Sequence, residues 1–327
     1  MTAHRFNITE SLKHLVLMLG AIIVALPFYV MLSSSLKSPG EIERNEGGFL
    51  GSQALMVDEY CVKRGEPDRA QVEAAISAGD QASEAAARER LDTELRERCE
   101  KRPALFNYTT AFSETPLLRY LLNGIIVTAS IFFLQVIVAV PAAYALSKLR
   151  FWGRDGVFSL VLICLLLPVH AVALPLYIVF AKLGLTNTYA ALVIPWTISV
   201  FGIFLMRQFF TTVPDDLIDA ARMDGMSEWS IVWKVMLPTA VPALLAFAIF
   251  SVVAHWNDYF WPRMVLTGDR SLFTPPLGLD EFRGGGGDGS LYGPMMATAT
   301  VIVAPLIVAF LLAQRRFVEG ITLSGMK

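Results

Sequence analysis

Six long stretches of mainly apolar residues recur along the chain, and polar segments separate them. Each is long enough to cross the hydrocarbon core of a bilayer, which takes about 20 residues of helix. The pattern predicts an all-α polytopic membrane protein with six transmembrane helices, at residues 15–32, 117–146, 156–180, 190–206, 239–261 and 294–313. The first stretch follows Arg5 and Lys13 and also fits a signal peptide. Its length and the spans that follow it favour an uncleaved helix.

Composition agrees with this class. Hydrophobic residues make up 54% of the chain and charged residues only 17%, whereas soluble domains have roughly 45–50% and about 25%. These values exclude an intrinsically disordered chain and a disulfide-scaffold protein. The net charge of −2 gives no basis for nucleic-acid binding.

The basic residues of the short loops predict the orientation. Eleven Lys and Arg fall at the termini and in the loops on the same side, and four fall in the opposite short loops. Because positive charge is retained on the cytoplasmic side, both termini are predicted to be cytoplasmic. Residues 41–103 are left out, since long segments translocate largely regardless of charge.

Residues 41–103 differ in character from the rest. They hold fifteen Asp and Glu against ten Lys and Arg, and they are rich in strong helix formers. We expect an extracytoplasmic helical insert between residues 1–40, which carry the tail and first span, and residues 104–327, which form a core with five spans. Cys61 and Cys99 lie within the insert and could form a disulfide in an oxidising compartment; the alternative is two unrelated thiols.

Residues 214–238, on the cytoplasmic side, predict a helix, a glycine turn and a second helix. Pro214 suits the first helical position, and Gly225 is placed to end the first helix. Ser227 can cap the second helix. Its predicted apolar face has i, i+3, i+4, i+7 spacing at Trp229, Val232, Trp233 and Met236.

This loop resembles the EAA loop of ABC-importer permeases, whose pattern is E-A-A, three residues, G, nine residues, I, one residue, L-P. The matching positions are Asp219, Ala220, Ala221, Gly225, Val235, Leu237 and Pro238. Asp replaces Glu and Val replaces Ile, both mild departures. The segments Asn123-Gly124, 141–147, 256–262 and 315–322 are similar to second permeases of the maltose and glycerol-3-phosphate type, whereas residues 41–103 look like a lineage-specific extension.

The resemblance implies the ABC-importer permease fold in the cytoplasmic membrane. In that family the loop forms a coupling helix that sits in a groove of an ATPase subunit; an ordinary amphipathic surface loop is the alternative. Implied partners are a second permease, two ATPase subunits and a periplasmic or lipid-anchored substrate-binding protein. No G-x-x-x-x-G-K-[ST] stretch occurs, so we expect no cofactor on this chain and ATP with Mg²⁺ on the partner ATPases.

The substrate path should be lined by polar and aromatic side chains of the spans, although each is also explained by a structural role. The candidates are Asn123, Gln135, His170, Tyr177, Asn257, Asp258 and Tyr259. In such importers an outer loop can reach into the docked binding protein; the candidates here are Arg283, Gly285 and Gly287, and a plain surface loop is the alternative.

An enzyme is not indicated, because the four His and three Cys have no metal-ligand or catalytic spacing. An ion-coupled secondary transporter is the alternative function. It is disfavoured because the mid-span regions hold almost no ionisable residues. A di- or oligosaccharide, a polyol and glycerol-3-phosphate all remain open as the solute.

Overall fold

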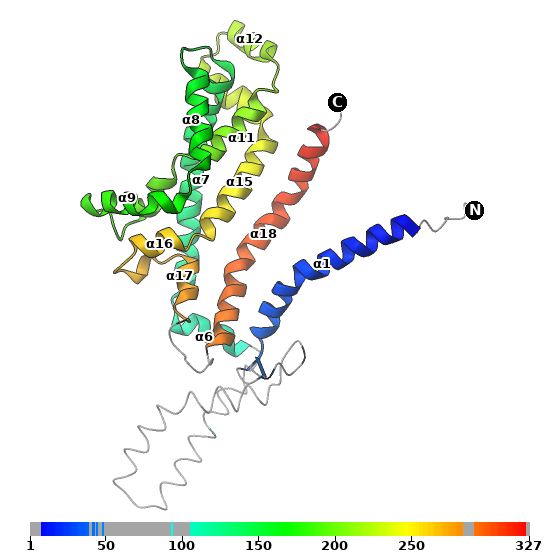
Figure 1. Cartoon of the computed structure of the whole chain (residues 1–327), viewed down its shortest axis with the longest axis vertical. Coiled ribbons are helices and arrows are strands. Elements are labelled where there is room, and N and C mark those ends of the chain that lie inside the picture. Colours follow the sequence, from blue (N-terminus) through cyan, green and yellow to red (C-terminus); the bar gives the residue numbers. More distant parts are fainter. Residues whose placement is uncertain are drawn as a thin grey trace, which may run out of the picture. The chain divides into compact units, whose positions relative to one another are not determined.

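The computed structural model describes residues 8–38, 105–283 and 291–324, together with the single residues 41, 42, 44, 48 and 93. Helices are the regular elements of these ranges, and no strand occurs within them (Figure 1). In chain order they are α1 (Ile8–Ser34), α6 (Phe106–Glu114), α7 (Leu117–Lys148), α8 (Arg154–Leu166), α9 (Val169–Lys182), α10 (Tyr189–Val193), η3 (Ile194–Trp196), α11 (Val200–Phe210), α12 (Asp215–Met223), α13 (Glu228–Ile231), η4 (Val232–Met236), α14 (Leu237–Thr239), α15 (Val241–Trp256), α16 (Phe260–Val265), η5 (Arg270–Leu272), α17 (Pro275–Asp280) and α18 (Tyr292–Ser324).

Four helical segments are long and apolar enough to cross a membrane: Leu12–Ser34, Leu117–Lys148, Tyr189–Phe210 and Tyr292–Leu312. Two further pairs of helices are long and apolar enough only if each bent pair is counted as one span. Counting them so would give six candidate spans among the described residues. The prediction of an all-α, multi-span protein is confirmed. Six continuous helices at the predicted positions are not observed.

The predicted span at residues 156–180 is broken in the middle. Its helices Arg154–Leu166 and His170–Lys182 meet at 99°, and α9 turns away from α8 (Figure 1). Leu167 has φ −74° and ψ 122°, which is an extended conformation. Pro168 explains the break, because the residue before a proline is pushed out of the helical region and proline itself cannot donate a hydrogen bond.

The predicted span at residues 239–261 is also divided. The helical segment Glu228–Thr239 meets Val241–Trp256 at 84°, and α16 forms a separate short helix after Asn257. Ala240 has φ −97° and ψ 13°, outside the helical region, and Pro242 stands at the start of α15. A proline in the first turn is compatible with a new helix but not with continuation of the previous one.

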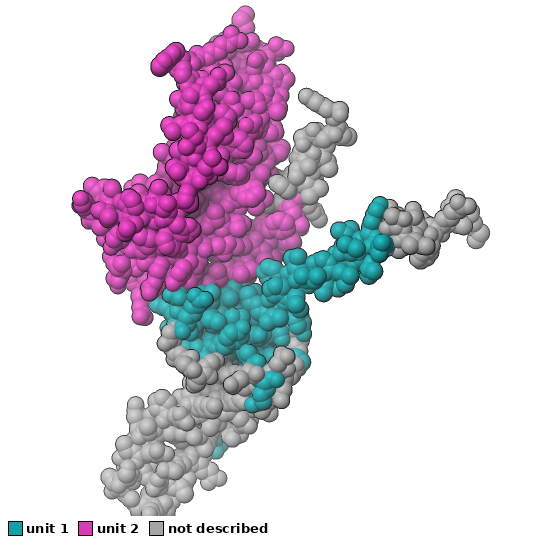
Figure 2. Space-filling model, viewed as in Figure 1, with its two compact units in different colours: residues 1–116, 279–301 teal, residues 117–278, 302–327 magenta. Residues whose placement is uncertain are grey.

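Two compact units divide the chain, and each is described by itself (Figure 2). The first comprises Met1–Pro116 and Leu279–Val301. In it the Asn107 amide donates to the carbonyl oxygens of Ser35 (2.8 Å) and Lys37 (3.0 Å), which ties α6 to the end of α1. Most of residues 41–103, with Cys61 and Cys99, lies outside the described residues, so the helical insert and its disulfide stay predictions.

The second unit comprises Leu117–Gly278 and Ile302–Lys327. In this unit the long helix α7 packs against both α11 and α15. The contact of α11 with α15 is unusually close, because a Cβ added at Gly202 would lie 2.3 Å from Cζ of Phe247. The short helix α12 lies at one end of the bundle that α7, α8, α11 and α15 form (Figure 1).

Candidate functional site

The first helix of the predicted cytoplasmic loop is α12, and it begins one residue later than predicted. Pro214 is the N-cap, with φ −60° and an extended ψ of 138°, and Asp215 is the first helical residue. Lys148, at the end of α7, donates from Nζ to the Val213 carbonyl oxygen (2.5 Å) and to Asp215 Oδ1 (2.6 Å). This ammonium holds the pKa of Asp215 below its ordinary value. The start of α12 is thereby fixed to α7.

The glycine turn after α12 has the predicted form. Gly225 has φ 77°, a left-handed conformation that glycine adopts without strain. The Gly225 N–H donates to the Arg222 carbonyl (3.0 Å) and the Met226 N–H to the Ala221 carbonyl (3.1 Å). These two bonds are the Schellman arrangement, which satisfies the last carbonyls of the helix and reverses the chain.

The second helix of the loop begins at its predicted cap, where Ser227 Oγ accepts from the Ser230 N–H at 3.3 Å. The predicted apolar face is only partly right. Val232 and Met236 are buried, but Trp229 is 61% exposed and Ile231 is fully buried instead. The chain also widens into a π-helix at η4 before Pro238, and α14 carries it on to Thr239. Since π-helical turns do not follow a 3.6-residue period, the spacing rule loses its register here.

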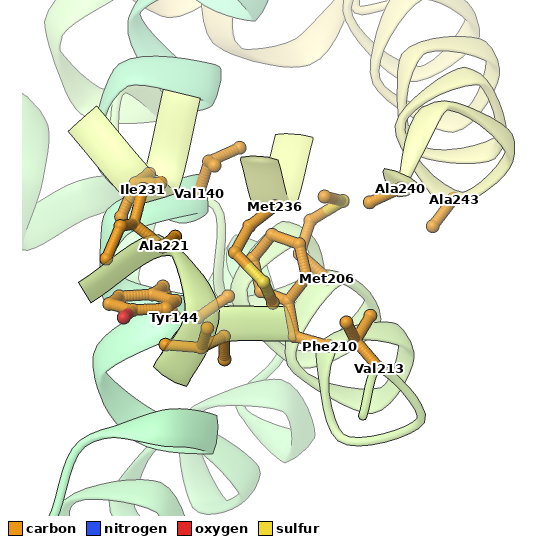
Figure 3. Packing of buried hydrophobic residues seen from close by; sticks show 13 residues of the cluster. Val140, Tyr144, Met206, Phe210, Val213, Ala221, Ile231, Met236, Ala240 and Ala243 are labelled. Carbon is orange, nitrogen blue, oxygen red and sulfur yellow. The ribbon is translucent and has the colours of Figure 1, made fainter. Parts of the chain in front are cut away.

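The inner face of α12 packs into this chain's own core (Figure 3). Ile218 and Ala221 lie in a cluster with Tyr144 of α7, Phe210 of α11 and Ile231 of α13. The two adjacent alanines therefore have different roles in packing. Ala221 is 6% exposed and is enclosed by this cluster, whereas Ala220 lies on the exposed side.

The outer face of α12 carries apolar side chains that the sequence analysis missed. Met223 is 88% exposed and Leu217 is 42% exposed. With Ala220 they recur every three residues along one side of the helix, which is the signal that could have identified them. Further along the loop, Val235 and Leu237 pack partly against the core, and Pro238 is exposed.

Charged groups connect the two helices of the loop. Arg222 donates from Nε to Glu228 Oε1 (2.8 Å) and from Nη1 to Asp219 Oδ1 (3.1 Å). The hydroxyl of Tyr144 donates to Glu228 Oε2. The hydrogen bond between Arg222 and Glu228 raises the pKa of the Arg222 guanidinium and lowers the pKa of the Glu228 carboxyl, which favours the charged form of both groups.

A polar pocket of about 380 Å³ lies beside α12. Its lining comes from the end of α7 and the following loop on one side and from α12 on the other: Lys148, Leu149, Arg150, Asp215, Ile218, Asp219 and Arg222. Three basic and two acidic side chains line it, and two ion pairs are formed among them, Lys148 with Asp215 and Arg222 with Asp219. Within the described ranges, no group of His, Cys, Asp and Glu side chains is arranged to hold a metal ion.

Two of the substrate-path candidates are engaged in contacts between helices and loops. The Asn123 amide donates to the Ser271 and Phe273 carbonyls (both 2.9 Å) and accepts from the Tyr189 hydroxyl (2.7 Å). Gln135 forms a separate buried cluster, in which its amide nitrogen donates to a backbone carbonyl and its oxygen accepts from a hydroxyl. The partners are the Trp196 carbonyl (2.8 Å), Ser251 Oγ (2.6 Å) and, at 3.2 Å, the Nε2 atom of His255.

Most of the other candidates lie where α9 packs against α16 and the residues just before α16. The centroids of the His170 and Phe260 rings are 4.7 Å apart. Tyr177 is partly buried against an apolar cluster that is separate from the cluster around α12. Asn257 donates to the Val253 carbonyl at 2.8 Å. Two candidates remain near α16: Asp258, which accepts from the Trp261 N–H at 3.2 Å, and the 37%-exposed Tyr259. Of the outer-loop candidates, Arg283 forms an ion pair in which its Nη1 lies 3.9 Å from Oδ1 of Asp280. Gly285 and Gly287 fall outside the described residues.

Comparison with known proteins decides the family. Residues 135–322 match the model of the binding-protein-dependent transport system inner membrane component. The chain belongs to this family. It is therefore an ABC-importer permease, a transport subunit rather than an enzyme, and it is a multi-pass protein of the inner membrane.

Individual relatives of the permease agree. It is 34% identical to an arabinooligosaccharides transport system permease protein of Halalkalibacterium halodurans, over 68% of this chain and 79% of the relative. It is 28% identical to an sn-glycerol-3-phosphate transport system permease protein of Brucella abortus, over 96% of each chain. A crystal structure of a bacterial ABC transporter involved in alginate import shares the fold, with a TM-score of 0.70 at 20% identity, over 97% of this chain and 99% of that one.

Proposed function

We propose that this permease is the second permease of an importer for a carbohydrate or related solute. It would form the translocation path with a different permease, two ATPase subunits that bind ATP and Mg²⁺, and an exported binding protein. Relatives named for arabinooligosaccharide and sn-glycerol-3-phosphate transport support this solute class. The bias of Lys and Arg toward the loops on one side supports cytoplasmic termini.

The α12 helix is proposed to be the coupling helix that the ATPase moves. The observation that carries this proposal is the two-sided character of α12: its inner face is buried among the ends of the spans, and its outer face exposes Leu217, Ala220 and Met223. A helix that is packed on one side and apolar on the other can bind a groove and pass a displacement to the spans. The left-handed turn at Gly225 ends that helix after Met223.

The proposal is tested with Ala220→Glu in a complex reconstituted with the second permease, the ATPases and the binding protein. Arabinooligosaccharides and sn-glycerol-3-phosphate serve as the test solutes. Because Ala220 is exposed, the variant should fold and insert, but the bulky charge should prevent docking and abolish solute-stimulated ATP hydrolysis. Trp152→Ala is the control, since Trp152 is an almost fully exposed apolar residue outside the α12 loop. Normal stimulated hydrolysis by Ala220→Glu would exclude the coupling role.

The substrate path and the outer contacts are proposed at the residues named from the sequence. Aromatic faces and hydrogen-bonding side chains suit a sugar, and His170, Tyr177 and Tyr259 combine both properties. Residues 41–103 are proposed to lie outside the cytoplasm, and Arg283 with its glycine-rich neighbours to contact the binding protein. Labelling of single cysteines placed at residues 80–98 from the outer side would support this topology, and labelling only from the cytoplasm would contradict it.

A further inference from the structure

Hydrogen bonds from α7 to other parts of its unit occur at three levels along the helix. At Asn123 the helix holds the backbone at Ser271 and Phe273, and at Gln135 it holds Trp196 and Ser251. At its far end, Tyr144 and Lys148 hold the α12 loop. Residues 123 and 144 are separated by about 32 Å along a helix that rises about 1.5 Å per residue. One continuous helix therefore has directional contacts along most of the thickness of a bilayer.

The contact at Tyr144 differs from the apolar packing around it. The Tyr144 side chain is 2% exposed, and its hydroxyl donates to Glu228, the first residue of α13. Glu228 also accepts from Arg222, which belongs to the last turn of α12. A single carboxylate thus joins α7, α12 and α13 across the glycine turn.

Hydrogen bonds of this kind restrict the relative movement of two helices more than apolar packing does. Apolar contacts, such as those of Ile218 and Ile231, are not directional, so they permit one helix to slide or rotate against another. Charge-assisted hydrogen bonds are directional and short, and they fix the register of the groups that they join. When the α12 loop is displaced, α7 must follow it while these bonds are intact.

We propose that Tyr144, Arg222 and Glu228 form a latch that fastens the α12–α13 hairpin to α7, so that α7 transmits the movement of the hairpin to the levels of Gln135 and Asn123. The three are positioning residues, since they act through the hairpin and through α7. This inference rests on the proposed coupling role of α12 and adds to it the route by which the displacement enters the spans.

The test compares solute imported per ATP hydrolysed in the reconstituted complex, with the two test solutes named above. Tyr144→Phe keeps the buried ring and removes only the hydroxyl. We expect it to assemble and to retain the basal ATPase rate, and we expect imported solute per ATP to fall about tenfold, as for loss of one hydrogen bond to a charged group. Tyr292→Phe is the matched control, because Tyr292 is 39% exposed at the start of α18.

A second variant separates the latch from a general loss of stability. Glu228→Gln keeps an acceptor for the tyrosine hydroxyl and removes the charge that binds Arg222. If the three residues act as a unit, the double variant Tyr144→Phe with Glu228→Gln should import as much solute per ATP as the more severe of the two single variants. Additive losses in the ratio would contradict a latch.

The outcomes also distinguish the latch from the coupling role itself. If Ala220→Glu abolishes stimulated hydrolysis while Tyr144→Phe transports solute per ATP as the wild type does, the latch is wrong and the coupling role stands. If neither variant changes its readout, both proposals are wrong. If Tyr144→Phe does not assemble, the test depends on Glu228→Gln. A wild-type amount of solute imported per ATP in Glu228→Gln would then overturn the latch.

Discussion

Gly225 offers a test of why a glycine stands at this turn. Its φ of 77° lies in the left-handed region, and a Cβ added there would meet no atom within 4 Å in this chain. A substitution should therefore be costly because of backbone strain and not because of a collision within the permease. The alternative is that glycine is needed so that another surface can come close. A series of side chains separates the two explanations, because Asn is larger than Ala but tolerates the left-handed region better.

The expected magnitudes follow from the backbone. A non-glycine residue in this region costs about 1–2 kcal/mol. Replacing glycine also restricts the unfolded chain, which offsets about 0.4–1 kcal/mol of that cost. We expect Gly225→Ala to lower the free energy of unfolding by about 1 kcal/mol. Gly225→Asn should have a smaller effect, and Gly225→Val a larger one, since a β-branched side chain is the least compatible with this conformation.

Two measurements on the same three variants decide between the explanations. Thermal unfolding of the purified permease should rank stability as Gly, Asn, Ala and Val, with a shift of about 2–4 °C for Ala. Stimulated ATP hydrolysis in the reconstituted complex should follow the same order if the turn conformation positions α12. If Gly225→Asn is more impaired than Gly225→Ala in both measurements, side-chain size is the determinant and the strain argument is refuted.

Three further outcomes are expected. Gly202→Ala should destabilise the permease by about 1–3 kcal/mol in thermal unfolding, because the added methyl overlaps the Phe247 ring. A second substitution in the same chain, Phe247→Leu, should restore part of the lost stability. An unchanged melting temperature in Gly202→Ala alone would contradict the close packing. Asn123→Ala should cost at least about 2 kcal/mol, because it removes the donor to two backbone carbonyls and the acceptor of a tyrosine hydroxyl; unchanged stability with impaired uptake would instead indicate contact with the solute. Thiol counting in the denatured, non-reduced protein should find one free thiol if Cys61 and Cys99 are bridged, and three free thiols would exclude the bridge.

The candidate site was predicted from the sequence to the extent that its determinants are local. The helix, the glycine turn and the second helix within residues 214–238 depend on caps and breakers, and the structure has them at Gly225 and Ser227. The buried face of the second helix was predicted less well, because its π-helical turn changes the period on which the prediction depended. The roles of Asn123 and Gln135 were not predictable, since their partners lie 61 to 150 residues away in the chain.

Three properties could be read from the sequence alone: the chain is helical, it is built from long apolar segments, and residues 214–238 have the pattern of an importer permease. These properties follow from hydropathy, from proline and glycine, and from fixed spacings, all of which act between near neighbours. The folded chain was needed to show that Ala221 faces inward while Ala220 faces outward, and that Tyr144 contacts Glu228. The physical reason is that burial and hydrogen-bond partners depend on which distant helices pack together, and neither α7 nor α12 specifies its neighbour through its own residues alone.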